Sequence, residues 1–142
     1  MKTVKQMIDE KSQELLFVSP DETVFVALKL MEKFDIGALV VLEKDKLVGI
    51  FSERDYARKV ILLGKSSKDT FVSEIMTNKV MYVKPENTVE ECMALMTKKR
   101  VRHLPVVESD RTVGVISIGD IVKEMMSEQK FIIDQLEQYI RG

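Results

Sequence analysis

Apolar residues in the first half of the chain recur first at helical and then at strand spacing. A helix is expected to begin near Thr23, because the apolar residues after it lie three or four positions apart and share one face. Two short apolar runs, residues 38–42 and 47–51, follow with polar residues between them, which predicts two strands joined by a turn. A second helix is expected over residues 53–63, ended by Gly64.

The second half shows the same succession of patterns. Helices are expected to begin near Thr88 and near Ile118, with strands over residues 103–107 and 113–116 between them. In both halves a short β-prone run precedes the first helix and stops near a proline, which predicts a brief strand. These two runs are residues 17–18 and 81–83.

A direct comparison of the two halves identifies an internal duplication. At an offset of 65, residues 18–57 align with residues 83–122 without a gap, and 15 of the 40 pairs are identical. Average composition would give roughly two or three identities by chance. Upstream, residues 4–8 match residues 72–76 at an offset of 68. A long period that occurs twice predicts two modules packed against each other.

The predicted fold class is α/β (α+β), with a strand, a helix, two strands and a helix in each repeat. Repeat 1 covers residues 1–66, repeat 2 covers residues 67–127, and residues 128–142 form an amphipathic helix outside the repeats. The apolar stripe of that helix would pack either on its own domain or against a second copy. It consists of Phe131, Ile132, Leu136 and Ile140.

Composition and charge narrow the functional classes. The 142 residues are 45% hydrophobic and 32% charged, with a net charge of −1, which is typical of a globular chain with a core. General nucleic-acid binding is disfavoured, because it rests on a basic excess. The longest apolar run is five residues, there is no signal-peptide pattern, and Cys92 is the single cysteine. We therefore expect a cytoplasmic protein without a membrane segment, a disulfide or a multi-cysteine metal site.

A doubled motif, Gly-x-x-Ser-x-x-Asp, begins at Gly49 and at Gly114, in both cases where a strand should end and a helix begin. Unpaired N–H groups at a helix N-terminus suit a phosphate, and an aspartate there can accept two hydrogen bonds from a ribose diol. The same Ser-x-x-Asp spacing is also that of a capping box. The pattern alone leaves a ligand site and a helix cap both open.

The chain resembles a tandem pair of cystathionine-β-synthase (CBS) domains, the Bateman module, and is similar to the small stand-alone CBS-pair proteins of bacteria. The resemblance rests on the doubled motif, on Arg-His-Leu-Pro-Val-Val at residues 102–107, and on Val-x-Pro-x-x-Thr-Val at Val18 and Val83. It covers about residues 4–127. It implies two βαββα units about a pseudo-two-fold axis, with a cleft that takes adenosine compounds such as AMP, ATP, NAD or S-adenosylmethionine, and dimerisation into flat discs.

The resemblance also assigns roles to individual residues. Asp55 and Asp120 would bind ribose hydroxyls, and Ser52 and Ser117 would contact ribose or the first phosphate. The other nucleotide-binding candidates are Arg54, Arg102, His103 and Gly119 near the phosphates, and Leu16, Met81 and Pro105 around the adenine.

The two repeats differ at one basic pair. Arg102 and His103 of repeat 2 correspond to Gly37 and Ala38 of repeat 1, which carry no charge. Two unequal sites are therefore expected, or one larger ligand such as NAD across both. Replacement charges in repeat 1 would come from Arg54, Arg58 and Lys59, with Lys11 as a weaker candidate.

The sequence contains no P-loop, no dinucleotide-binding glycine motif and no Cys/His ligand set, so an enzyme is not expected. The function that fits best is a non-catalytic sensor of adenine nucleotides, a homodimer that acts on a separate protein effector. One alternative is a constitutive dimeric interaction module with an empty cleft. The other is a regulator that binds single-stranded nucleic acid through the basic residues 98–102.

Overall fold

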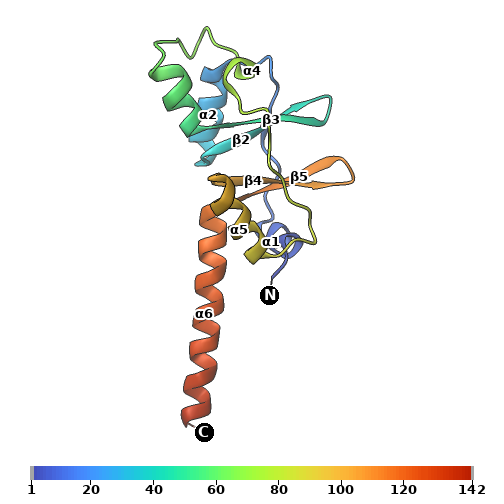
Figure 1. The fold of residues 1–142 in the computed structure, drawn as a ribbon, viewed down its shortest axis with the longest axis vertical. Helices are drawn as coiled ribbons and strands as arrows, with labels where there is room; N and C mark the ends of the chain where they lie inside the picture. The colour runs from blue at the N-terminus through green and yellow to red at the C-terminus, as the bar shows by residue number, and fades with distance from the viewer. Residues whose placement is uncertain (1, 142) are drawn as a thin grey trace.

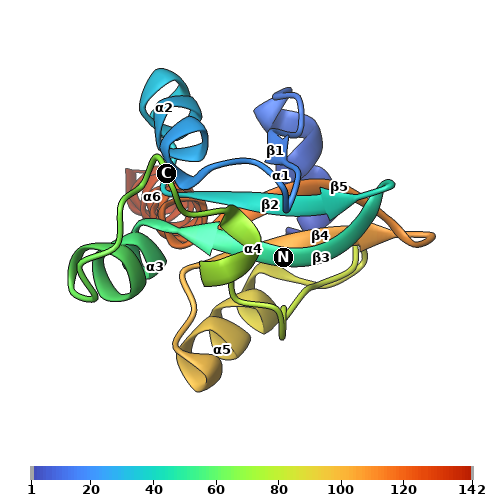
Figure 2. The same cartoon turned by 90° about the horizontal axis from the view of Figure 1, so that it is seen from above.

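The computed structural model describes residues 2–141, which form two stacked α/β units and a long helix that projects from one of them (Figure 1). We call these the upper and the lower unit by their place in Figure 1. Each unit contains a β-hairpin, and strand β3 (Lys46–Ser52) of one lies against strand β5 (Arg111–Ser117) of the other (Figure 2). This arrangement confirms the expected α/β (α+β) fold class.

The upper unit contains a three-stranded sheet in the order β1-β2-β3, in which β2 and β3 are antiparallel and β1 is parallel to β2. Its elements are β1 (Phe17–Val18), α2 (Val24–Phe34), β2 (Ala38–Glu43), β3, α3 (Glu53–Tyr56), the π-helix η1 (Ala57–Ile61) and α4 (Val72–Ile75). Thr23 caps α2 by accepting a hydrogen bond from the N–H of Val26, which confirms the expected start. The helix expected over residues 53–63 is α-helical only to Tyr56 and ends before Gly64, whose φ is +68°.

The lower unit contains the second hairpin and both the first and the last helix of the chain. Its elements are α1 (Val4–Lys11), α5 (Val89–Lys99), β4 (His103–Glu108), β5 and α6 (Ile118–Arg141). Thr88 and Glu91 form a capping box at the start of α5, as their spacing predicts. Helix α6 runs without a break to Arg141, so residues 128–141 of the expected tail helix are the outer half of the helix that begins at Ile118, and Gly142 lies outside the described residues.

The brief strand expected at residues 81–83 is reduced to one residue. Val83 makes a single parallel bridge to Val106, whereas β1 pairs with β2 over two residues. Pro105 stands where repeat 1 has Val40, and proline has no N–H to extend the ladder. The expectation of a strand here was therefore wrong for a reason that the sequence already contained.

The two repeats exchange their first helices. Val4 and Met7 of α1 are buried in the core of the lower unit, which repeat 2 otherwise supplies. Val72 and Ile75 of α4 are buried in the core of the upper unit, which repeat 1 otherwise supplies. Repeats 1–66 and 67–127 therefore describe the duplicated sequence, while each packed unit takes one helix from the other half.

Equivalent backbone hydrogen bonds fix both exchanged helices. The N–H of Val4 donates to the Asn87 carbonyl at 2.8 Å, and the N–H of Val72 donates to the Glu22 carbonyl at 2.8 Å. These pairs correspond to each other in the duplication, which shows the approximate two-fold symmetry directly. Separating the units would expose both buried helix faces and leave these backbone groups unpaired.

The glycine that opens each doubled motif lies under an exchanged helix. A Cβ on Gly49 would fall 2.5 Å from Sδ of Met76 and 3.1 Å from the carbonyl oxygen of Thr77. A Cβ on Gly114 would fall 2.4 Å from Cδ1 of Ile8. Close packing against backbone therefore accounts for Gly49, whereas at Gly114 the crowding comes only from the Ile8 side chain.

Gly49→Ala is expected to lower the free energy of unfolding by about 1–3 kcal/mol, because the new Cβ overpacks the contact with Met76 and Thr77. Urea unfolding measures the loss. Gly119→Ala is the matched control, since the nearest atom to its Cβ would be Oγ of Ser117 at 3.6 Å. An equal loss in the two variants would contradict the packing role of Gly49.

Candidate functional site

Both doubled motifs form helix caps. The N–H of Asp55 donates to Oγ of Ser52 at 3.2 Å, and the N–H of Ser52 donates to Oδ2 of Asp55 at 3.0 Å. At the start of α6 the N–H of Asp120 donates to Oγ of Ser117 at 3.1 Å, and the N–H of Ser117 donates to Oδ2 of Asp120 at 2.8 Å. The capping interpretation is thus confirmed, and a ligand role depends on the atoms that the caps leave free.

Asp55 has no such free atom. Its side chain is buried, and Oδ1 accepts hydrogen bonds from Nζ of Lys59 at 3.0 Å and from Oγ1 of Thr77 at 3.2 Å. Oδ2 accepts from both the N–H and the hydroxyl of Ser52. The carboxylate in repeat 1 is therefore satisfied by the protein itself.

Asp120 is more open. Oδ2 accepts from the N–H of Ser117 and pairs with Nζ of Lys11 at 2.9 Å, but among residues 2–141 no group bonds to Oδ1. About a fifth of its side chain, 21%, is exposed. The two aspartates therefore differ in their surroundings, in addition to the sequence difference at the basic pair.

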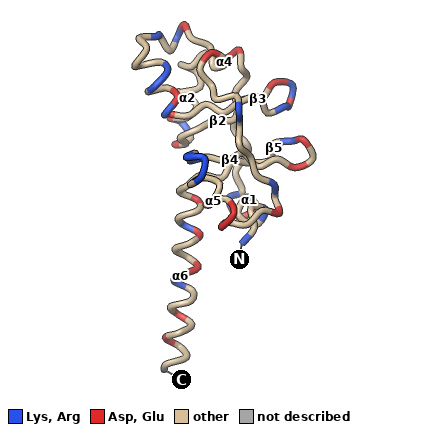
Figure 3. The backbone as a smooth tube through the Cα atoms, viewed as in Figure 1, with Lys and Arg blue, Asp and Glu red and all other residues tan. Residues whose placement is uncertain are grey.

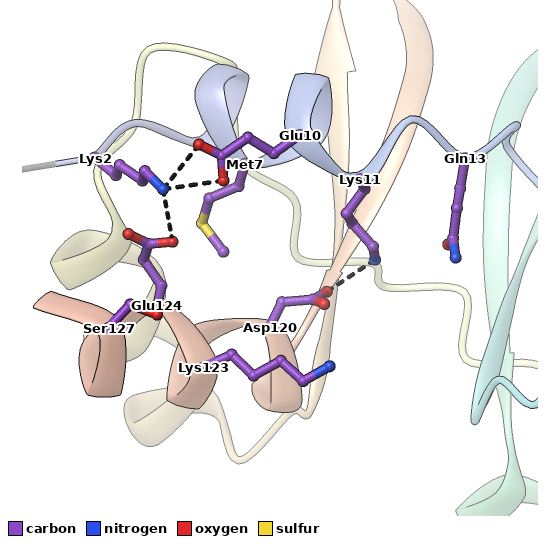
Figure 4. A pocket seen from close by; sticks show the side chains of 9 residues that line it. All are labelled: Lys2, Met7, Glu10, Lys11, Gln13, Asp120, Lys123, Glu124 and Ser127. Atoms are coloured by element: carbon purple, nitrogen blue, oxygen red, sulfur yellow. Dashed lines mark hydrogen bonds and ion pairs between the residues drawn. The ribbon is translucent and has the colours of Figure 1, made fainter. Parts of the chain in front are cut away.

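Asp120 faces a hollow of about 430 Å³ between α1 and α6 (Figure 4). In Figure 4, Lys11 of α1 and Lys123 of α6 lie on either side of Asp120, while Lys2 is held by Glu10 and Glu124. The lining residues are Lys2, Met7, Glu10, Lys11, Gln13, Asp120, Lys123, Glu124 and Ser127. The exchange of helices builds this hollow, because it brings α1 from the start of the chain beside α6 at its end.

The electrostatic setting keeps Asp120 ionised and His103 neutral. Burial acts to raise the pKa of Asp120, but the hydrogen bond from Ser117 and the ammonium of Lys11 together hold it below its usual value. Burial lowers the pKa of His103, an effect that Lys11 and Arg102 support and Asp120 opposes. The role of His103 beside a phosphate remains a prediction.

The basic candidates are dispersed. Arg102 is exposed and makes no ion pair within the described part of the chain, whereas Arg54 donates to the carbonyl of Arg100 at 3.2 Å and joins the two repeats. The His103 ring lies 3.4 Å from where a Cβ on Gly37 would be. Lys59 binds Asp55 and the Ile75 carbonyl, so its charge is paired within repeat 1, whereas Arg54 bonds only to a carbonyl and its role near a phosphate remains a prediction.

The adenine candidates lie away from the hollow. Leu16 packs against the upper core, Met81 packs against the lower core, and Pro105 is buried in β4, where its carbonyl accepts from Val83. Gly119 is exposed in the first turn of α6. The roles of these four residues remain predictions.

Sequence reasoning missed most of the residues that line the hollow. Three of them, Lys2, Glu10 and Gln13, precede the aligned segment of residues 18–57. Two others, Lys123 and Glu124, follow the second copy of the doubled motif. The match between residues 4–8 and 72–76 was the available signal, but it showed only that the segments are equivalent, not that they are exchanged.

Two other features carry no chemistry that points to a site. Cys92 is buried in the lower core, and this burial, with Glu91 and Glu90 nearby, raises its pKa to about 11, which keeps the thiol protonated. Within residues 2–141 no three His, Cys, Asp or Glu side chains gather as metal ligands. No helix in the same range is both long and apolar enough to cross a membrane.

Asp120→Asn is expected to reduce stability at neutral pH, because the folded state lowers the pKa of this carboxyl and so favours its ionised form. That stabilisation is present above the unfolded value of 3.8 and is lost as the pH falls through the folded pKa. Urea unfolding between pH 7 and pH 2 should show the two proteins converging at low pH. Asp134→Asn, on the outer half of the same helix, is the control, and a gap for Asp120→Asn that stays constant to pH 2 would contradict the account.

Comparison with known sequences identifies a matching family model and related proteins. The family model for the CBS domain matches residues 4–61 and 72–127. The chain is 44% identical over 132 residues to the CBS domain-containing protein CBSX3, mitochondrial, of Arabidopsis thaliana, covering 89% of this chain. It spans 64% of the length of CBSX3. Since that relative is described as mitochondrial, the expected cytoplasmic location remains a prediction.

Solved structures give the same answer for the fold. The crystal structure of the CBS domain NE2398 has a TM-score of 0.84 and 50% identity, covering 88% of this chain and 98% of that one. The CBS domain pair of protein MJ0100, crystallised in complex with 5′-methylthioadenosine and S-adenosyl-L-methionine, has a TM-score of 0.81 and 25% identity, covering 90% and 98%. With two matched domains and the same fold, this chain belongs to the CBS domain family as a tandem pair.

Proposed function

We propose that this CBS pair, a regulatory module by family, binds an adenine nucleotide of the AMP, ATP or NAD type in the hollow between α1 and α6. The observation that carries the proposal is the carboxylate of Asp120, which reaches this hollow from the first turn of a helix and has one oxygen without a bonding partner among residues 2–141. The adenosine compounds bound to the MJ0100 pair support the class of ligand.

The ribose would bind through Asp120. Two neighbouring ribose hydroxyls can donate to one carboxylate, and hydrogen bonds to an ionised acceptor are the stronger kind. The lowered pKa of Asp120 keeps the acceptor ionised, and Oδ1 is available for this purpose. A carboxyl with this pKa is a poor proton donor at neutral pH, so we propose a sensor and not an enzyme.

The phosphate would bind at the helix start and its flanking lysines. The N–H of Ile118 already donates to the Arg102 carbonyl and that of Asp120 to Ser117, which leaves the N–H of Gly119 among the first three positions of α6. Lys123 lines the hollow without an ion pair in the described chain, and Lys11 is within reach. These cations favour a phosphate ester over the sulfonium of S-adenosylmethionine.

Binding would act first on how α1 is held in the lower unit. Helix α1 comes from the start of repeat 1 and α6 from the end of repeat 2, but both pack in the lower unit, so a ligand contacts both halves of the sequence within one unit. It can shift the arrangement only if it binds one arrangement better than another. We propose that a separate protein effector reads this shift.

The basic segment favours no second function. In Figure 3 the backbone is coloured as Lys or Arg where α5 passes into β4. Lys98 and Lys99 occupy the last turn of α5 and Arg100 caps it, and cations stabilise a helix at this end. A nucleic-acid role through residues 98–102 has no further observation behind it.

Asp120→Ala is expected to weaken nucleotide binding by about 10- to 100-fold, which corresponds to the loss of charge-assisted hydrogen bonds. Asp55→Ala should weaken it less, because Asp55 is committed to Lys59 and Thr77. Isothermal titration with AMP, ATP, NADH and S-adenosylmethionine, after removal of co-purified ligand, measures both. Thermal melting checks that each variant folds.

Equal losses in the two variants would refute the inequality of the sites. If no compound gave heat or a shift in Tm with the wild-type protein, the proposed function itself would be refuted.

Lys123→Met is expected to weaken AMP binding several-fold at low salt and to leave adenosine binding unchanged, because the lysine meets only the phosphate. Lys79→Met is the matched control, since Lys79 is exposed and lies outside the hollow. The same loss for AMP and adenosine would contradict the placement of the phosphate.

A further inference from the structure

The apolar face of the outer half of α6 is not covered by the rest of the described chain. Every residue from 126 to 141 is exposed, and Figure 1 shows this segment extending away from both units. At least half of the surface of each large apolar residue in this segment is exposed, as in Ile133 at 54%, Leu136 at 56% and Ile140 at 81%. A helix of about this length is marginal in water unless its apolar face is covered.

The apolar residues follow a heptad pattern. Met126, Ile133 and Ile140 are seven residues apart, and Gln129 and Leu136 lie between them at spacings of three and four. Such alternation marks the a and d positions of a coiled coil. One edge of this stripe carries Ile132 and Tyr139, and the other edge carries Lys130 and Glu137.

We propose that residues 128–141 of α6 pair in antiparallel orientation with the same segment of a second copy of this chain. With Ile133 opposite Leu136 of the second copy, Gln129 lies opposite its Ile140, and the core pairs repeat by symmetry. In that register Lys130 lies opposite Glu137 of the second copy, and the reverse pair forms as well.

In the same register, the edge with Ile132 and Tyr139 makes apolar contacts with the second copy. Ile132 lies opposite Tyr139 of the second copy, again twice by symmetry. The overlap covers only the segment that projects beyond the folded units, so the two bodies sit at opposite ends of the paired helices. One alignment therefore satisfies the heptad positions, both edges and the shape of the protein, and it leaves Phe131 on the outward face, seven residues before Gln138.

A parallel pair and a lipid surface fit less well. In parallel orientation, heptad geometry would bring Lys130 beside Met125 and Glu137 beside Ile132 of the second copy, without an ion pair. A membrane-binding helix carries an excess of Lys and Arg on its polar face. Residues 126–141 instead carry two basic and three acidic side chains, Lys130 and Arg141 against Glu128, Asp134 and Glu137.

The first test is the assembly state of the full-length protein by sedimentation equilibrium. Leu136→Asp is expected to raise the dissociation constant at least 100-fold, because it puts a charge into two core layers. The variant should then be a monomer where the wild type is a dimer, or a dimer where the wild type is a tetramer because another surface also pairs. Gln138→Asp, on the outward face of the same helix, is the control and should leave the assembly unchanged.

Charge exchange tests the orientation. Lys130→Glu and Glu137→Lys should each raise the dissociation constant by roughly tenfold, since two attractive contacts become repulsive. The double variant should restore most of the affinity, because each copy again meets an opposite charge. Circular dichroism verifies that every variant keeps its helix content.

Three results would overturn the proposal. The first is a wild-type protein that stays monomeric over a 100-fold range of concentration, or that binds neutral and anionic vesicles as a monomer. The second is an assembly that Leu136→Asp leaves intact. The third is assembly of the single charge variants with wild-type affinity.

Discussion

The exchange of α1 and α4 between the repeats is the contact on which the rest of the structure depends. Val4 and Met7 complete the lower core, and Val72 and Ile75 complete the upper one. A repeat of about 60 residues buries too little surface to be comfortably stable alone, and each obtains part of its core from the other half of the chain. The same exchange brings α1 beside α6 and so creates the hollow that Asp120 faces.

The duplication is symmetric in its backbone and unequal in its chemistry. The caps, the motif glycines and the hydrogen bonds of the exchanged helices recur in both repeats. At the two aspartates the surroundings diverge, because Thr77 and Lys59 satisfy Asp55 while Lys11 alone reaches Asp120 from another helix. One site can therefore keep the fold together while the other remains open to a ligand.

The sequence predicted the features that depend on local rules and on the repeat. Thr23 and Thr88 cap their helices, the hairpins form, and Pro105 could have warned that the strand before it would shorten. The sequence did not predict the exchange of α1 and α4, because the similarity of two segments is the same whether each packs in its own repeat or in the other one. It also missed Lys123 and Glu124 as lining residues, since their role depends on a neighbour more than 100 positions away.

Helix α6 joins the two surfaces that this account assigns, with Asp120 in its first turn and an exposed apolar stripe beyond residue 126. We expect the ligand to bind beside Asp120, and a crystal structure of the 142-residue protein with AMP would show its position. Ribose hydroxyls should lie on Oδ1 of Asp120, with the phosphate near Gly119 and Lys123. Density for AMP beside Asp55 instead, or a hollow between α1 and α6 left empty at saturating AMP, would contradict this expectation.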